Sequence, residues 1–275
     1  MSRPPCRRLI VGRCVVITGA AGGLGTALAE RYAAAGAKLA LLDLDAARVE
    51  GLAARLRAQG AAATAHACDI ADEAACFAAI ASTERALGAI DLLVNNAGVS
   101  ARLLLRDATP EIARRVMAVN YFGALHATQA ALPALVERRG QIVVVSSVAG
   151  FAPLVGRTAY AASKHALHGF FDSLRAELHG AGVAITIACP SFIATGIESA
   201  APGAARRATG GDEATPEAMA AQIVAAAQRG DRLCLPGRTA RMAWWLSRVA
   251  PAAYERAMLR RVGAEFGLSM GSDAR

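Results

Sequence analysis

The chain has 275 residues, of which 55% are hydrophobic and 19% are charged. This composition predicts a large buried core in one or two domains and excludes an intrinsically disordered chain. The net charge of +8 comes from 30 basic and 22 acidic residues spread along the chain. Since no basic block is interleaved with aromatic residues, nucleic-acid binding is not expected, and the basic surface serves either solvation or a general attraction for anionic substrates and membrane surfaces.

Apolar runs and amphipathic segments alternate along the first two thirds of the chain. Short apolar runs predict strands at residues 14–18, 38–43, 63–68, 91–95, 141–146 and 183–189. Amphipathic segments predict helices at residues 24–35, 45–59, 72–87, 109–138 and 157–179, with Asp45 as a helix N-cap and Pro110 at a first helical position. Pro133 suggests a kink or an earlier end of the fourth helix. The alternation is typical of a parallel sheet covered on both faces.

The character of the chain changes after Pro190. Residues 199–215 are rich in Ala, Gly and Arg and fit either a mobile flap or a plain surface loop. A helix is expected over 216–229, a short strand over 232–235, and a last helix over 239–266. Its apolar positions are Trp244, Trp245, Leu246, Val249, Tyr254, Met258, Leu259 and Val262.

Cysteine usage and the lack of leader segments indicate a cytoplasmic protein. Six cysteines lie far apart without a C-x-x-C pair, and four of them fall in or beside apolar β-runs, where cysteine behaves as a small core residue. We recognise no signal peptide, and no uncharged apolar run reaches the roughly 18 residues of a membrane span. The histidines have neither the spacing nor the carboxylate partners of a metal site.

The turn after the first strand, G-A-A-G-G-L-G over Gly19 to Gly25, has the properties of a phosphate-binding turn. It does not fit G-x-G-x-x-G, but the glycines permit a sharp turn and a close approach of backbone to a diphosphate at a helix N-terminus. Asp43 ends the second strand, where a carboxylate accepts hydrogen bonds from ribose hydroxyls and repels a 2′-phosphate. Because Ala20 and Ala21 offer no cation, NAD is favoured over NADP. An aspartate acting only as a turn residue is the alternative.

Tyr160 and Lys164 lie one helical turn apart, so their side chains share a face. A neighbouring ammonium favours the phenolate and lowers the pKa of a tyrosine from its ordinary value of about 10. Ser147, at the end of a strand, can then hold a substrate oxygen while Tyr160 exchanges its proton. A Tyr and a Lys at this spacing also occur by chance on solvated helix surfaces.

With these motifs and N-N-A-G at Asn95 to Gly98, the chain resembles the short-chain dehydrogenase/reductase family over about residues 10 to 237. Thr18 to Gly25 fits that family's T-G-x-x-x-G-x-G motif. The resemblance implies a Rossmann-type doubly wound parallel sheet of about seven strands. It also implies a homodimer or homotetramer. We therefore divide the chain into a dinucleotide-binding catalytic domain at 1–237 and a helical extension at 238–275.

The resemblance also assigns site residues. The catalytic tetrad is Asn120, Ser147, Tyr160 and Lys164, with Asn120 holding a water in a proton relay. The expected cofactor contacts, besides Tyr160 and Lys164, are Gly19, Gly22, Gly23, Leu24, Gly25, Asp43, Leu44, Asp69, Ile70, Asn96, Ala97, Gly98, Pro190, Ile193 and Thr195. One departure is Pro190-Ser191 where the family has Pro-Gly, which changes local backbone freedom near the nicotinamide.

The apolar residues expected around the substrate favour a lipophilic secondary alcohol or ketone. They are Leu103 to Leu105, Phe151, Leu154, Val155 and Phe192, whereas Arg102, Arg106 and Arg157 would instead suit an anionic group. The extension, with arginines among its tryptophans and leucines, forms either an amphipathic membrane-surface helix or a segment packed across the substrate mouth or a subunit partner. We favour packing.

The sequence thus predicts an NAD-dependent oxidoreductase that interconverts a lipophilic secondary alcohol and its ketone. A reductase of 3-oxoacyl or related carbonyl substrates that uses NADP(H) is the enzymatic alternative. A nucleotide-sensing protein without catalysis is the non-enzymatic one.

Overall fold

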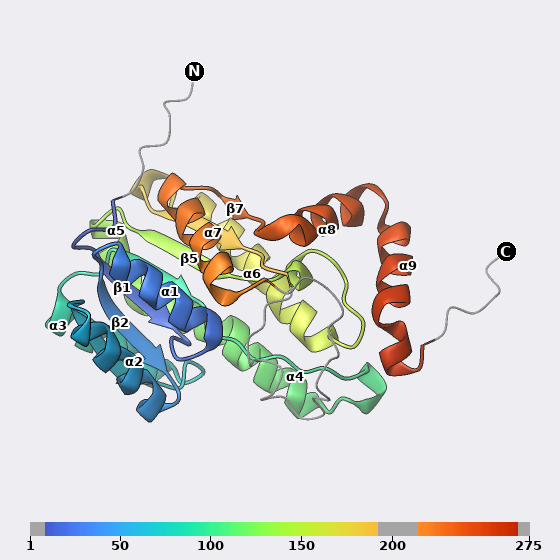
Figure 1. Ribbon diagram of the computed structural model, residues 1–275, viewed down its shortest axis with the longest axis horizontal. Helices are drawn as coiled ribbons and strands as arrows, with labels where there is room; N and C mark the ends of the chain where they lie inside the picture. The colour runs from blue at the N-terminus through green and yellow to red at the C-terminus, as the bar shows by residue number, and fades with distance from the viewer. Residues whose placement is uncertain (1–8, 192–213, 269–275) are drawn as a thin grey trace, which may run out of the picture.

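The computed structural model describes residues 9–191 and 214–268, and its centre is a parallel sheet of seven strands (Figure 1). The strands are β1 (Cys14–Thr18), β2 (Lys38–Asp43), β3 (Ala63–Ala67), β4 (Leu92–Asn95), β5 (Gln141–Val145), β6 (Ala184–Ala188) and β7 (Leu233–Cys234). They lie in the order β3-β2-β1-β4-β5-β6-β7, and every neighbouring pair is parallel. The predicted doubly wound fold class is therefore confirmed.

Helices cover both faces of this sheet. They are α1 (Gly23–Ala34), α2 (Ala46–Ala58), α3 (Glu73–Leu87), α4 (Pro110–Met117), α5 (Gly123–Glu137), α6 (Thr158–Glu177) and α7 (Pro216–Arg229), followed by α8 (Gly237–Val249) and α9 (Pro251–Val262). Alternate strand residues face opposite layers: Val15 and Ile17 pack with α1, α2 and α7, whereas Val16 packs with α3, α5 and α6. Because both faces are covered, β1 and β5 are buried along their whole length.

The predicted helix boundaries hold where capping residues mark them. The Asp45 side chain accepts a hydrogen bond from the Arg48 backbone N–H at 3.0 Å and caps α2. Pro110 is the first residue of α4, and α7 spans the predicted residues 216–229.

The prediction of one regular helix over residues 109–138 is wrong in its middle. A five-residue π turn, η2 (Ala118–Phe122), lies between α4 and α5. Pro133 does not end the helix, which continues to Glu137. A π turn widens the helix locally and is frequent at functional sites, and here it contains Asn120.

The extension after β7 is two helices rather than the one predicted over residues 239–266. Ala250, between α8 and α9, has a non-helical backbone (φ −142°, ψ 67°) because the following Pro251 disfavours a helical conformation there. After α9 a 3-10 turn, η6 (Gly263–Phe266), follows. In Figure 1 the two helices form an arm on the side of the molecule away from α2 and α3. Among the described residues, no helix has both the length and the apolar character needed to cross a membrane.

The extension packs on the domain through its smaller residues. Ala240 and Ala243 of α8 and Tyr254 of α9 form an apolar cluster with residues of the loop after β5. The ring of Trp244 packs edge-on against Phe151, with centroids 4.9 Å apart. Other apolar positions assigned to this helix from the sequence are exposed instead: Trp245, Leu246 and Val249.

Candidate active site

The residues singled out in the sequence lie at the carboxyl ends of the strands. β1 and β4 are neighbours although they are not consecutive, so the direction of winding reverses between them. In doubly wound sheets ligands bind at such a switch point, beyond the carboxyl ends of the strands. Gly19 follows β1, Asp43 ends β2, Asn96 follows β4 and Ser147 comes two residues after β5. The fold thus gathers them at one edge of the sheet.

The glycine turn between β1 and α1 has no room for side chains at its two tightest points. Gly19 has a φ of +63°, and a Cβ there would lie 2.7 Å from the Ala97 Cα. A Cβ at Gly25 would lie 2.1 Å from the Gly19 carbonyl oxygen. The remaining predicted residues of the turn lead into α1: Gly22, Gly23 and Leu24. Bare backbone at the N-terminus of a helix suits an anionic diphosphate.

Hydrogen bonds between the ends of β1 and β4 fix the shape of this turn. The Thr18 hydroxyl oxygen accepts hydrogen bonds from the backbone N–H groups of Asn96 and Ala97 at 3.1 and 3.0 Å. The Asn96 side-chain amide donates to the carbonyls of Thr18 and Gly19, both at 3.0 Å. The predicted contacts Asn96 and Ala97 therefore stand beside the glycine turn.

Asp43 is held against the same turn. Its carboxylate accepts hydrogen bonds from the backbone N–H groups of Ala21 at 2.9 Å and Asp45 at 3.1 Å. Leu44, next to it, is 64% exposed and offers an apolar surface at this edge. The Arg48 guanidinium donates to the Ala21 carbonyl at 2.7 Å, which brings a cation to the turn.

Sequence reasoning missed Arg48 because it considered only the turn itself for cations. The available signal was its place three residues after the N-cap Asp45, in the first turn of α2, which begins where β2 ends.

Asp69 and Ile70, two of the predicted cofactor contacts, follow β3, which pairs with β2 up to Asp43. The Asp69 carboxylate accepts a hydrogen bond from the Ala71 backbone N–H at 2.9 Å and lies 3.5 Å from the Arg115 guanidinium. Ile70 is buried. The two residues thus border the end of the site where Asp43 lies.

Asn120 links three separate segments. Its side-chain oxygen accepts from the Val99 N–H at 2.8 Å, and its amide nitrogen donates to the Val99 carbonyl at 3.0 Å and to the Ser163 hydroxyl at 2.9 Å. The side chain is 1% exposed. A Cβ at Gly98 would lie 3.3 Å from its oxygen and 3.6 Å from the Lys164 Nζ, so these groups are close neighbours. Sequence reasoning did not single out Ser163.

Lys164 is buried beside Tyr160. Its Nζ donates a hydrogen bond to the Val145 carbonyl at 2.9 Å and lies 5.7 Å from the centroid of the Tyr160 ring. Burial lowers the pKa of the Lys164 ammonium to about 8. The Arg157 guanidinium carbon lies 5.7 Å from the same ring, so two cations flank this tyrosine. The half-buried Tyr160 ring therefore lies close to two cationic side chains.

Ser147 and Pro190 meet where β5 and β6 end. Ser147 caps the short 3-10 turn η3 (Val148–Gly150), and its hydroxyl oxygen accepts from the Ala149 N–H at 3.2 Å. The Pro190 carbonyl accepts from the Val148 N–H at 3.1 Å, which joins the two segments. Two predicted cofactor contacts lie outside the described residues: Ile193 and Thr195.

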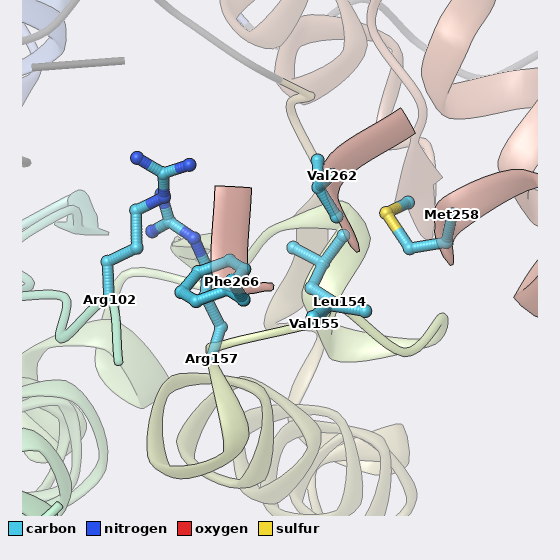
Figure 2. A pocket seen from close by; sticks show the side chains of 7 residues that line it. All are labelled: Arg102, Leu154, Val155, Arg157, Met258, Val262 and Phe266. Atoms are coloured by element: carbon cyan, nitrogen blue, oxygen red, sulfur yellow. The ribbon is translucent and has the colours of Figure 1, made fainter. Parts of the chain in front are cut away.

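A small pocket lies between the loop before α6 and the extension (Figure 2). It is lined by Arg102, Leu154, Val155, Arg157, Met258, Val262 and Phe266. Arg102 pairs with Glu265 and stacks on the Phe266 ring, with its guanidinium carbon 5.4 Å from the centroid. Arg157 donates to the Ser100 hydroxyl at 2.5 Å. The pocket is therefore apolar on one side and cationic on the other.

Only some of the predicted substrate contacts line this pocket. Leu154, Val155, Arg102 and Arg157 do, whereas Leu105 and the side chain of Arg106 are each 71% exposed. Phe192 lies outside the described residues. The extension was expected only as a segment packed across the mouth. Met258 and Val262 were predicted as apolar positions of its helix but not as pocket residues, and Phe266 was not singled out.

Comparisons with known proteins agree with this geometry. A family profile described as short chain dehydrogenase matches residues 13–204. Dehydrogenase/reductase SDR family member 7B from Bos taurus is 41% identical over 198 residues, which are 70% of this chain and 61% of that protein. Dehydrogenase/reductase SDR family protein 7-like from Anopheles gambiae is 35% identical over an alignment that covers 92% of this chain and 84% of that protein. The chain spans about three fifths of the mammalian relatives it matches.

Solved structures agree as well. A short-chain dehydrogenase/reductase from Burkholderia phymatum in complex with NAD is 26% identical, with a TM-score of 0.78 over 98% of this chain and 99% of the other. A short-chain dehydrogenase from Burkholderia cenocepacia in complex with NADP has 26% identity and a TM-score of 0.79 over 92% of this chain and 99% of the other. From fold, site and relatives together, the chain belongs to the short-chain dehydrogenase/reductase family.

Proposed function

We propose that this protein is an NAD-dependent oxidoreductase that interconverts a lipophilic secondary alcohol and its ketone. The observation that carries the proposal is the buried Lys164 ammonium beside the Tyr160 ring. This ammonium lies close to Gly98, at the carboxyl ends of the strands where the glycine turn also lies. A positively charged neighbour is what a phenol needs to act as a general acid and base near neutral pH.

The residues present fit a nicotinamide dinucleotide. The bare backbone at Gly19 and Gly25 would receive the diphosphate, Asp43 would accept hydrogen bonds from the adenosine ribose hydroxyls, and the exposed Leu44 side chain would border the same end of the site. The bound cofactor supplies or accepts the hydride. Asp43 and the NAD complex of one structural relative support NAD. Arg48 at the turn and the NADP complex of another relative are the arguments for the alternative.

In the direction of reduction, Tyr160 donates its proton to the carbonyl oxygen, and in oxidation it removes the alcohol proton. Ser147 holds the same oxygen by a hydrogen bond. Lys164 keeps the tyrosine acidic and binds the nicotinamide ribose. The Asn120 side chain hydrogen-bonds to Val99 and Ser163, so it positions the segment after β4.

The test is a panel of hydrophobic secondary alcohols with NAD, read as NADH absorbance. It includes a 3-oxoacyl thioester with NADPH, because one structural relative is a 3-ketoacyl-(acyl-carrier-protein) reductase from Brucella melitensis and because Arg102 and Arg157 line the pocket. Tyr160→Phe is expected to abolish turnover while NADH binding persists. Tight NADH binding without turnover of any substrate would favour the nucleotide-sensing alternative.

We also propose a homodimer or homotetramer that assembles through η2 and α6. Phe122 is 47% exposed, and Tyr121 packs edge-on against Phe122 and Phe170, with centroids 5.0 and 5.9 Å away. Such an exposed aromatic cluster is typical of interface cores. Light scattering after gel filtration of wild type and Phe122→Asp tests this, and a monomeric wild type would refute it.

The buried thiols support a cytoplasmic location. All five cysteines in the described ranges are free and buried: Cys14, Cys68, Cys76, Cys189 and Cys234. Reduced thiols persist in a compartment kept reducing by glutathione and thioredoxin.

A further inference from the structure

Helix α8 presents its largest apolar side chains to solvent. Met242 is 67% exposed, Trp245 68%, Leu246 37% and Val249 76%. Their spacing of i, i+3, i+4 and i+7 puts them on one face of the helix, which we call the α8 stripe. A helix that serves only to cover a domain would turn these residues inward.

The stripe is not the result of a detached helix. The opposite face of α8 is anchored through Ala240 and Ala243, which are 0% and 8% exposed. Trp244 packs on Phe151, and the Arg248 guanidinium carbon lies 3.0 Å from the centroid of the Trp244 ring. The small residues therefore fix the orientation in which the α8 stripe points outward.

The charge around the α8 stripe is predominantly positive. α8 contains no acidic residue, and its exposed arginines are Arg238, Arg241 and Arg248. In α9 a single acid, Glu255, stands among exposed Arg256, Arg260 and Arg261. Apolar residues, including a tryptophan, flanked by arginines are the composition of a helix that lies in a lipid interface.

We propose that the α8 stripe docks this protein peripherally on an anionic lipid surface. The arginines would meet lipid phosphates while Trp245 and its neighbours enter the headgroup boundary. A second copy of this chain is the less favourable occupant. A two-fold interface through the same face would bring the arginines of both copies together, and α8 itself contains no acid to pair them.

The docking face and the pocket wall belong to one extension. α9 follows α8 after a single residue and carries Met258 and Val262, which line the pocket. On the proposed function, an apolar substrate dissolved in the bilayer would reach the pocket along this extension. The docking itself does not depend on that function, so it is tested by binding rather than turnover.

The experiment uses the full chain with vesicles of phosphatidylcholine alone or mixed equally with phosphatidylglycerol. We expect co-sedimentation with the anionic vesicles, weakened by salt. The chain has two tryptophans, so Trp244→Phe leaves Trp245 as the reporter. Its emission is expected to shift to the blue on binding. Absence of co-sedimentation and of the shift would overturn the proposal.

A matched pair of variants assigns the binding to the stripe. Trp245→Ser with Val249→Ser is expected to weaken vesicle binding about tenfold or more, because both lose apolar surface that enters the interface. The control is Phe77→Ser, an exposed aromatic residue of α3 (44%) on the other side of the molecule. Equal binding by both variants would overturn the proposal. The proposal would also be overturned if the wild type formed a concentration-dependent dimer that is lost in the stripe variant but kept in the control variant.

Discussion

Lys164→Met is expected to make the protein more stable at neutral pH while it removes activity. The folded state lowers the pKa of this ammonium from 10.5 to about 8 by burial. The native state therefore binds fewer protons than the unfolded state between these two pH values, so the free energy of unfolding rises with pH across that window. Below pH 8 the full cost of burying the charge is present.

The size of the effect follows from the two pKa values. At about 1.36 kcal/mol per pKa unit, the charge costs roughly 3 kcal/mol at pH 7 and about 1 kcal/mol at pH 10. Replacing it with methionine leaves the Val145 carbonyl without this donor, which costs about 1–3 kcal/mol. The variant should be about 1 kcal/mol more stable at pH 7, and its advantage should fall by about 2 kcal/mol by pH 10.

The assay is urea unfolding at fixed protein concentration over this pH range. The chain has only two lysines, so the exposed Lys38→Met is the matched control and should lack the pH-dependent difference. Of the neighbouring groups, burial raises the pKa of Cys189 to about 12 and lowers that of His168 to about 4. Both groups are present in wild type and variant, so their contributions to the pH dependence largely cancel in the difference between the two proteins. A stability difference that does not change with pH would refute the reasoning. NMR titration of isotope-labelled lysine checks the pKa directly.

Three further changes test other parts of the molecule. Gly156→Ala should lower the free energy of unfolding by about 2 kcal/mol and raise the KM for substrate, because the residue has a φ of +68° and its Cβ would lie 2.2 Å from the Phe266 ring. Thermal unfolding measures the stability and steady-state kinetics the KM. An unchanged KM would contradict the packing of Phe266 on this residue. Asp43→Ser should tighten NADPH binding about tenfold relative to NADH, because it removes a negative charge that repels the 2′-phosphate. If the ratio of the two dissociation constants in fluorescence titrations does not change, Asp43 does not determine cofactor selectivity. Asp91→Asn should cost about 2 kcal/mol, since this carboxylate is 7% exposed and accepts from the Arg13 guanidinium at 2.5 Å; wild-type urea midpoints would contradict it.

The strands and most helices were predictable because their signals are local. Short continuous apolar runs are typical of strands buried on both faces, and capping by Asp45 or a proline at the first helical position marks where helices begin. The order of the motifs then indicates which strand ends meet. That is why Asp43 and Asn96 were expected in one cofactor site, and in the structure both hydrogen-bond to the glycine turn.

The features that were missed depend on contacts between distant segments. The π turn at Asn120 lies in a continuous helical pattern, and its partners are Val99 and Ser163 in other parts of the fold. Periodicity showed that the extension has an apolar face, but it did not show that Ala243 would be buried against the domain while Trp245 stays exposed to solvent. Only the break before Pro251 had a local signal, the proline itself.

The contact of Phe266 with Gly156 also has a consequence for synthesis of the chain. The nucleotide end of the site is built from residues 18–98, whereas one wall of the pocket is translated more than 150 residues later, at 258–266. The cofactor-binding turn is therefore synthesised long before the extension that completes the substrate pocket. The pocket can form only after nearly all of the described chain has left the ribosome.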